Sequence, residues 1–411
     1  MPKIIKIRFT STLFTLSVIL LLLIGITAIY STTYSSASNS VLYKQLQWVL
    51  LGLIAATTIA LVPTDFLSKY SKYMLAAVLV PLAYLTIASL CILCLSKATG
   101  AQPSSLSKFF PFVVYNNGAA RWLHLAGFTM QPSEFAKFTI ILFLATYYGT
   151  RDTIKIESFK EGFLIPALAS AVVMALVFLG KSLSNTIILA SIVGIIMFVS
   201  GVRMRYLITS CFIAFLLVIV AVFSSGYRRQ RIINFVYKNK SEEVMTTGKK
   251  KADNHQLKRA ICALGSGGLT GLGIGRGRLK NQYIPESSTD FIFAVIGEEF
   301  GFLGILFAII LYLSFMVLSF IIATQTNNRR GVLIAITVGF FIPFQAMYNL
   351  SVVCGLMPTT GVTAPLVSYG GSSIISMMLC IGLVLNVCHG NYIATMNENQ
   401  PDTTQPQEAL A

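Results

Sequence analysis

The chain has 411 residues, of which 55% are hydrophobic and only 11% are charged. Soluble domains carry about 25% charged residues, so this composition excludes a soluble globular protein and indicates an integral membrane protein. The formal net charge of +16 comes from 31 Lys and Arg against 15 Asp and Glu, so each acidic residue can be considered individually.

Apolar runs of about 20 residues recur along the chain, which is the length that crosses a bilayer as a helix. Because these runs are continuous rather than alternating, they exclude a transmembrane barrel. We predict an all-α integral membrane protein, a polytopic bundle with a large extracytoplasmic loop between helices 7 and 8. Ten transmembrane helices are expected at 12–31, 46–63, 73–95, 133–149, 162–180, 184–201, 206–224, 302–323, 331–350 and 371–389.

The domain organisation follows from these runs. We assign residues 1–390 to a single transmembrane domain, with the extracytoplasmic loop at about 225–301. The polar segment 391–411, which lacks Lys and Arg, is predicted to be a disordered cytoplasmic tail.

Basic residues indicate the orientation of the bundle. The short segments on the side of the N-terminus hold twelve Lys and Arg, and those on the other side hold five. Because cytoplasmic loops carry the excess of basic residues, we expect both termini in the cytoplasm. The long outer stretch 225–289 nevertheless carries 13 Lys and Arg, and charge alone leaves open whether it is merely solvated or captures an anionic ligand.

The first long outer loop, 97–133, leads into a helix that starts near Pro132. Glu134 and Lys137 are three residues apart, so they share a helical face and can pair. Capping with an internal ion pair explains them without any function, and a functional site is the other reading.

The second long loop contains a glycine-rich stretch at 265–277, followed by basic residues as far as Lys280. Backbone amides with Arg276 and Lys280 would suit a phosphate or pyrophosphate group, although a flexible linker explains the glycines equally well. The spacing matches neither dinucleotide nor Walker motifs, so we expect no nucleotide cofactor and no nucleic-acid partner. Cys91 and Cys94 lie inside an apolar run and are expected only to pack.

Asp290 is the most informative residue, because a carboxylate at the edge of a membrane bundle is costly unless it is used. Thr289 and Asp290 could also simply cap the following helix. Farther along, the segment 368–373 is rich in Gly and Ser, and it could either permit close helix packing or line a polar cavity.

Nearly the whole chain resembles one family, the SEDS proteins of shape, elongation, division and sporulation. Three blocks carry the resemblance: Gly118-Ala119-x-Arg121-Trp122 with Gln131-Pro132-Ser133-Glu134-x-x-Lys137; Pro285-Glu286-x-x-Thr289-Asp290-Phe291-Ile292-Phe293-Ala294 with Gly297-Glu298-Glu299-x-Gly301; and Pro358-x-x-Gly361 with Ser368-Tyr369-Gly370-Gly371-Ser372-Ser373. The stretch 180–186 departs from the family pattern, because Lys181 and hydroxyl residues stand where an acidic element is usual.

The resemblance implies a peptidoglycan glycosyltransferase of the bacterial inner membrane that polymerises lipid II at the outer face. It also implies a class B penicillin-binding protein and other divisome proteins as partners, and dependence on a divalent cation, Mg²⁺ or Mn²⁺, at an unknown site. Asp290 would be the essential catalytic aspartate and general base. Substrate contacts are expected from Arg121, Glu134, Lys137, Arg276, Lys280, Glu286, Ser368 and Ser372.

Some alternatives stay open. Glu298-Glu299 and the Ser372-Ser373 ending favour the division branch, typified by FtsW and acting at the septum, and we predict that branch. The stretch 361–367 leans slightly towards the elongation branch, typified by RodA, which is the alternative. A lipid II flippase would also use a polar cavity between helices. A non-catalytic scaffold would leave Asp290 and Glu134 unexplained.

Overall fold

The computed structural model describes residues 3–34, 40–100, 102–116, 119–125, 128–223, 248–277 and 288–398. Helices dominate this part of the chain: α1 (Lys3–Tyr34), α2 (Ser40–Leu61), α3 (Thr64–Thr99), α4 (Pro103–Leu106), α5 (Pro132–Gly149), α6 (Thr153–Glu157), α7 (Ile165–Leu179), α8 (Leu183–Val199), α9 (Met204–Phe223), α11 (Gly248–Ser266), α12 (Ile292–Thr324), α13 (Arg329–Val353) and α14 (Gly371–Glu398). Seven candidate spans are long and apolar enough to cross a membrane, and α8 and α9 are shorter apolar helices. Each predicted segment coincides with a helix, which confirms the fold class.

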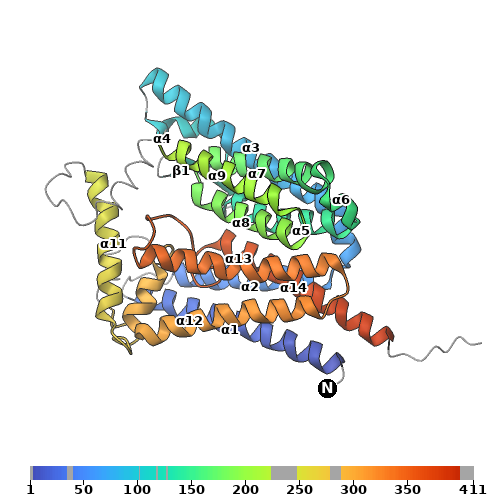
Figure 1. Ribbon diagram of the computed structural model, residues 1–411. Helices are drawn as coiled ribbons and strands as arrows, with labels where there is room; N and C mark the ends of the chain where they lie inside the picture. Colours follow the sequence, from blue (N-terminus) through green and yellow to red (C-terminus); the bar gives the residue numbers. More distant parts are fainter. Residues whose placement is uncertain are drawn as a thin grey trace, which may run out of the picture.

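The helices form two groups that meet along α5 (Figure 1). One group contains α1, α2, α12, α13 and α14, and the other contains α3, α5, α7, α8 and α9. Helix α5 packs on α3 and α8 in its own group and on α13 and α14 in the other. A polar side chain on the inner face of α5 therefore lies between the two groups.

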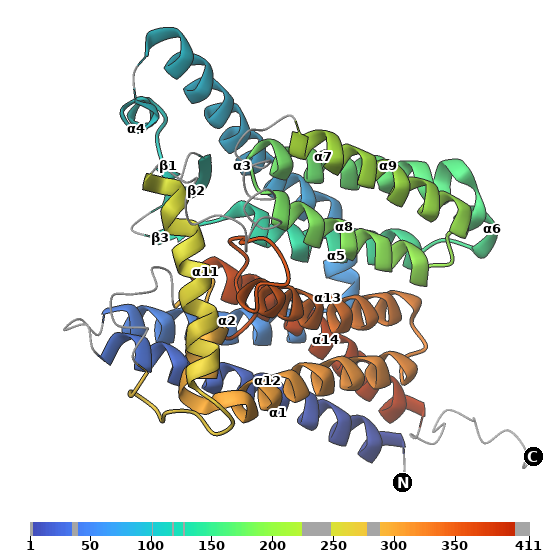
Figure 2. The same cartoon turned by 60° about the vertical axis from the view of Figure 1, so that its left-hand side comes forward.

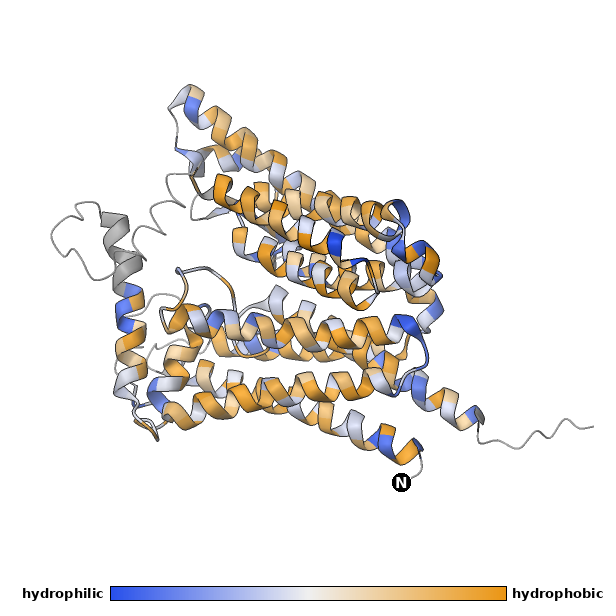
Figure 3. Ribbon diagram, in the orientation of Figure 1, coloured by the Kyte–Doolittle hydropathy of each residue, from blue (hydrophilic) through white to orange (hydrophobic). Residues whose placement is uncertain are grey.

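The two ends of the bundle differ. Both termini lie at one end, and α11 with the small sheet lies at the opposite end (Figure 2). Hydrophobic residues cover the length of the helices and hydrophilic ones gather towards their ends, as expected for a bundle in lipid (Figure 3). At the end with the termini, ion pairs join Arg330 to Asp65 at 3.2 Å and Arg203 to Glu157 at 3.1 Å.

The loop between α3 and α5 is folded, which the sequence did not predict. Besides α4 and a 3-10 turn (Ser107–Phe109), it forms an antiparallel sheet of strands β1 (Val113–Asn116), β2 (Ala119–Leu125) and β3 (Phe128–Met130), in that order. The strands are short, which explains why they escape detection from the sequence. Strand β3 ends just before α5 and so fixes where that helix begins.

The predicted outer loop at about 225–301 is also partly helical, because it contains α11 and the first turns of α12. Gly301 interrupts α12 with a positive φ of 69°, which a residue with a side chain rarely adopts. The segment 268–273 fills the opening and replaces the lost helical bonds. Four hydrogen bonds do so: Phe302 N to Gly268 O at 2.9 Å, Leu303 N to Leu269 O at 3.1 Å, Leu272 N to Glu298 O at 3.0 Å and Gly273 N to Glu299 O at 3.0 Å.

Helix α14 continues to Glu398, so the first eight residues of the segment that we predicted to be a disordered tail are helical. The boundary is corrected because these polar residues dock on their neighbours. The Asn391 side chain accepts a hydrogen bond from Thr326, and the Tyr392 hydroxyl accepts one from Arg8. The rest of the predicted tail, 399–411, lies outside the described residues.

Candidate active site

A buried ion pair lies in the first turn of α5. Lys137 is completely buried and Glu134 is 5% exposed, and the Lys137 Nζ stands 2.9 Å from the Glu134 Oε2. Pro132 occupies the start of the helix, as predicted, and Gln131 is the N-cap residue, without a side-chain capping bond. The pair is therefore more than an exposed helix-capping contact. Its two charges have been taken out of water and depend on one another.

Three polar residues from other helices complete this pair, and the sequence analysis did not single them out. Asn185 on α8 donates to Glu134 Oε1 at 3.3 Å, and Gln345 on α13 accepts from Lys137 Nζ at 3.0 Å. Ser376 on α14 donates to the backbone carbonyl of Glu134. Polar residues inside apolar helical runs are the signal that could have identified them.

Asp290 lies in a turn, 288–291, that leads into α12 at the end of the bundle that carries α11. The N-cap residue of α12 is Phe291, so Asp290 does not occupy the N-cap position that the capping interpretation assumed. The Asp290 side chain is partly exposed, and its Oδ2 lies 3.3 Å from where a Cβ on Gly361 would stand. A glycine at position 361 thus gives the carboxylate room.

Asn349 holds the backbone on both sides of this carboxylate. Its Nδ2 donates to the Asp290 carbonyl at 2.9 Å and also to the Val362 carbonyl, and the residue is 1% exposed. Asn349 thereby ties the turn before α12 to the segment that contains Gly361. The sequence analysis missed this residue as well.

The ion pair and the Asp290 turn are connected through α13. Gln345 and Asn349 are four residues apart, so they share one face of that helix. The Gln345 Nε2 donates to the Thr363 carbonyl at 3.0 Å, next to the Val362 carbonyl that Asn349 holds. A hydrogen-bonded path therefore runs from Lys137 to the segment 361–363 and on to Asp290.

Ser368 and Ser372, expected as substrate contacts, both make bonds within the protein. The Ser368 hydroxyl donates to the Thr289 carbonyl and accepts from Ala364 N at 2.8 Å. The Ser372 hydroxyl accepts from Gln131 N at 3.0 Å. The two serines thus anchor the chain beside Asp290 and the start of α5.

Arg121, on β2, holds the turn between α7 and α8. Its guanidinium donates to the carbonyl oxygens of Gly180, at 3.4 Å, and Lys181. Lys181 has a positive φ of 63°, and this turn begins the helix that carries Asn185. The stretch that departs from the family pattern therefore supplies a partner to Glu134 in place of an acidic group.

Arg276 belongs to a different cluster of residues from Asp290, the one around Ser31 and Glu299. Its side chain is exposed, while the neighbouring Gly275 N donates to Ser31 Oγ at 3.2 Å. Ser31 in turn donates to Glu299, which is 1% exposed, as is Glu298. Several amides of the glycine-rich stretch are thus engaged by α1 and α12. Of the other expected substrate contacts, Lys280 and Glu286 lie outside the described residues.

In the described part of the chain, no three His, Cys, Asp or Glu side chains lie close enough together to hold a metal ion. Mg²⁺ commonly keeps several waters and binds one or two carboxylates together with substrate phosphates. The phosphate oxygens of a substrate, together with water, would supply most of the ligands of such an ion. The site therefore combines a partly exposed carboxylate with a buried ion pair behind it.

The chain is similar to known proteins over most of its length. The family described as "Cell cycle protein", that of FtsW, RodA and SpoVE, matches residues 7–393. A "Probable peptidoglycan glycosyltransferase FtsW" of Haemophilus influenzae is 36% identical over 278 residues, covering 67% of this chain and 68% of that protein. "Stage V sporulation protein E" of Bacillus subtilis is 34% identical over 272 residues, covering 66% and 72%. A solved structure described as "Structural coordination of polymerization and crosslinking by a peptidoglycan synthase complex" has a TM-score of 0.72 at 24% identity, covering 92% of this chain and 97% of that one.

Proposed function

The chain belongs to the FtsW, RodA and SpoVE family of cell-cycle proteins, and we propose that it is a peptidoglycan glycosyltransferase that polymerises lipid II. The observation that carries the proposal is the Asp290 carboxylate, partly exposed at one end of the bundle on a turn whose backbone Asn349 holds. Relatives named as probable peptidoglycan glycosyltransferases support the reaction type.

The proposed orientation places both termini in the cytoplasm and Asp290 at the outer face. The end with the termini carries Arg151, Arg203, Arg329 and Arg330, in agreement with the positive-inside rule. Lipid II then meets Asp290 on the outer side of the inner membrane. Action at the division septum is the finer proposal, and the relatives named FtsW support it.

In the proposed reaction Asp290 is the general base. The acceptor sugar hydroxyl gives its proton to the Asp290 carboxylate as its oxygen bonds to the anomeric carbon of the lipid-linked donor. The bond from that carbon to the pyrophosphate breaks, and the undecaprenyl pyrophosphate leaves with the electron pair. A single displacement inverts the α-linked donor into a β-1,4 link, so one base suffices.

A divalent cation, Mg²⁺ or Mn²⁺, fits this proposal as a ligand of the pyrophosphate. The phosphate oxygens and water would supply its ligands, and Asp290, which takes the proton of the acceptor, would not coordinate it directly. The ion would neutralise charge that develops on the leaving group. Basic residues of the outer loop, such as Arg276 and Lys280, would serve the same purpose.

A class B penicillin-binding protein is the proposed partner. The solved structure with the same fold is described as part of a peptidoglycan synthase complex that coordinates polymerisation with crosslinking. A polymerase of this family needs a transpeptidase to crosslink its product, so a complex of the two chains is the form expected to act.

Purified protein and lipid II test the reaction directly. We expect glycan chains to form in a complex with the transpeptidase whose own active-site serine has been removed, and their length can be read on a gel. Translocation of lipid II across liposomes is measured in parallel. Translocation without polymer would instead assign the chain to lipid II transport. If the protein showed neither polymerisation nor translocation, the scaffold would be the remaining interpretation.

Asn349 is expected to be a positioning residue for Asp290. Replacing it with Ala removes both bonds from its Nδ2, so we expect polymerisation to fall through kcat with little change in KM. Loss of stability should be about 1–3 kcal/mol, since the two carbonyls are left without this donor. Ser351→Ala on the same helix is the control, because that hydroxyl donates to the Met347 carbonyl of its own helix.

The double variant separates positioning from general damage. If Asn349 acts through the Asp290 carboxylate, Asn349→Ala should change residual activity very little once Asp290 is replaced by Asn. Equal loss of activity in both backgrounds would mean that Asn349 only supports the fold.

A further inference from the structure

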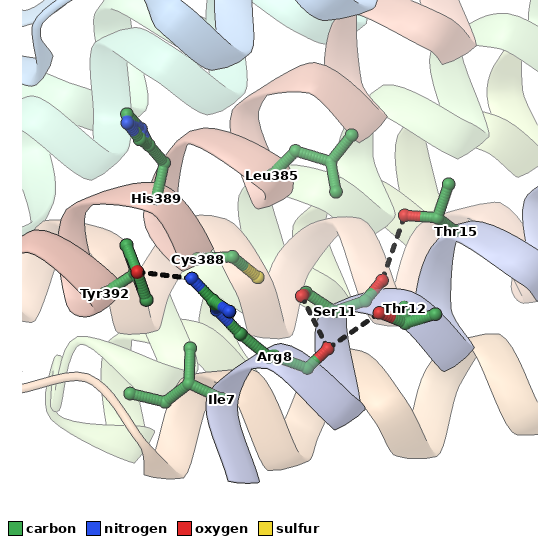
Figure 4. Close-up of a pocket in the computed structure, with 9 residues that line it drawn as sticks. All are labelled: Ile7, Arg8, Ser11, Thr12, Thr15, Leu385, Cys388, His389 and Tyr392. Atoms are coloured by element: carbon green, nitrogen blue, oxygen red, sulfur yellow. Dashed lines mark hydrogen bonds between the residues drawn. The ribbon is translucent and has the colours of Figure 1, made fainter. Parts of the chain in front are cut away.

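A cavity outside the proposed active site opens between α1 and α14, at the end of the bundle where the termini lie (Figure 4). Its volume is about 470 Å³. The polar part of its lining includes Arg8, Ser11, Thr12, His389 and Tyr392. None of the lining residues is acidic, and the mechanism proposed above does not use any of them.

Arg8 is the charged residue of the cavity, and its position is defined by Tyr392. The guanidinium donates to the Tyr392 hydroxyl, and its carbon lies 4.9 Å from the centre of the Tyr392 ring. A guanidinium has five N–H donors, so this bond leaves others for a ligand. Figure 4 shows Arg8 between the two helices, with the hydroxyl groups of Ser11 and Thr12 on α1 beside it.

The oxygens of these hydroxyls remain available as acceptors, because each O–H already donates to the backbone. Ser11 and Thr12 both donate to the Arg8 carbonyl, at 2.9 Å. The cavity therefore presents a fixed cation together with groups that can accept from a glycerol hydroxyl. A phosphate ester is the chemistry that matches it.

Apolar side chains mark the cavity as a site at the membrane surface. Ile7 and Leu385 belong to its lining. On neighbouring faces of α1, Ile5 is 48% exposed and Phe9 is 60% exposed, as residues that face lipid would be. With the termini in the cytoplasm, as proposed above, the cavity opens at the headgroups of the inner leaflet. Basic pockets between transmembrane helices on that side bind anionic headgroups.

We propose that the cavity between α1 and α14 binds the phosphate headgroup of an anionic glycerophospholipid, with Arg8 holding the phosphate. Ser11 and Thr12 contact the glycerol part of the headgroup, and Ile7 and Leu385 contact the beginning of the acyl chains. The bound lipid fills the space between the first and the last transmembrane helix.

Native mass spectrometry of the full chain tests this with short-chain phosphatidylglycerol, short-chain phosphatidylcholine and inorganic phosphate as probes. Arg8→Gln should lower the affinity for phosphatidylglycerol by about fivefold, the effect of one Arg at such a surface. Lys6→Gln is the matched control, since it removes the same charge from the same end of α1 but Lys6 does not line the cavity. Phosphatidylcholine should bind weakly and respond little to either substitution.

A second pair of variants tests the cavity without a change in charge. Thr12→Trp should fill it and displace phosphatidylglycerol, whereas Leu16→Trp adds the same ring to an exposed position of α1 that does not line the cavity. Thermal unfolding of each variant shows that the bundle remains folded.

Three outcomes would overturn the proposal. Equal effects of Arg8→Gln and Lys6→Gln would mean diffuse attraction to a basic surface. Binding of inorganic phosphate as tight as that of the lipid would mean a site for a soluble anion. Unchanged lipid binding in Thr12→Trp would place the lipid elsewhere.

Discussion

Asp290→Asn is expected to abolish polymerisation of lipid II, lowering the rate by at least about 10²-fold, because a positioned general base contributes roughly 10²–10⁴-fold. The amide has nearly the shape of the carboxylate but cannot take a proton from the acceptor hydroxyl. Asn349 bonds to the Asp290 backbone carbonyl rather than to its side chain, so this contact survives the substitution. Glycan chains formed by the purified complex are the measurement.

The control is Asp152→Asn, which makes the same chemical change at an exposed residue before α6, at the start of a helix of only five residues. It should polymerise as the unchanged protein does. Binding of lipid II to the Asp290→Asn variant should persist, since the proposed loss is in proton transfer. Full polymerising activity in that variant would remove Asp290 from the mechanism.

The sequence predicted the helices well because hydrocarbon imposes a simple rule. Every backbone polar group must be satisfied within the segment, so an apolar run of sufficient length has to be a helix. The same rule identified Asp290, Glu134 and Lys137, because charged groups are rare where burial makes them costly. Two of these three do meet in one buried pair.

The hydrogen-bond partners of these residues could not be predicted in the same way. Asn185, Gln345 and Asn349 are visible in the sequence as polar residues within apolar helices, but their partners depend on which helices pack together. Helix α5 brings Lys137 to Gln345 only because it lies between the two groups of helices. Crossings of that kind involve residues more than 200 positions apart in the chain.

The glycine-rich stretch gives a second example. From its composition it could be a flexible linker or a phosphate loop, yet it inserts into the interrupted helix α12. A Cβ on Gly267 would stand 1.9 Å from the Gly297 carbonyl, and one on Gly271 would stand 2.1 Å from the Glu299 carbonyl. These glycines therefore allow two backbones to approach, which composition alone cannot distinguish from flexibility.

Lys137→Met is the second substitution with a large expected effect. It leaves Glu134 buried without its cation, and breaking a buried pair in this way costs about 3–5 kcal/mol. Glu134→Gln should destabilise the protein similarly by isolating Lys137. The matched control is the exposed pair of Arg203 and Glu157 at the end with the termini, where Arg203→Gln should change stability by less than about 1 kcal/mol.

The double variant Glu134→Gln with Lys137→Met decides what the pair contributes. Two neutral side chains of similar size need no counter-charge, so thermal stability should return towards that of the unchanged protein. Polymerisation should not return with it, because the thioether that replaces the Lys137 ammonium cannot donate to Gln345, and Gln345 holds the segment that contacts Asp290. If the double variant recovered polymerisation together with stability, the pair would only hold the helices together. If stability returned but polymerisation did not, the ion pair would be needed to orient the active site and not to fold the protein.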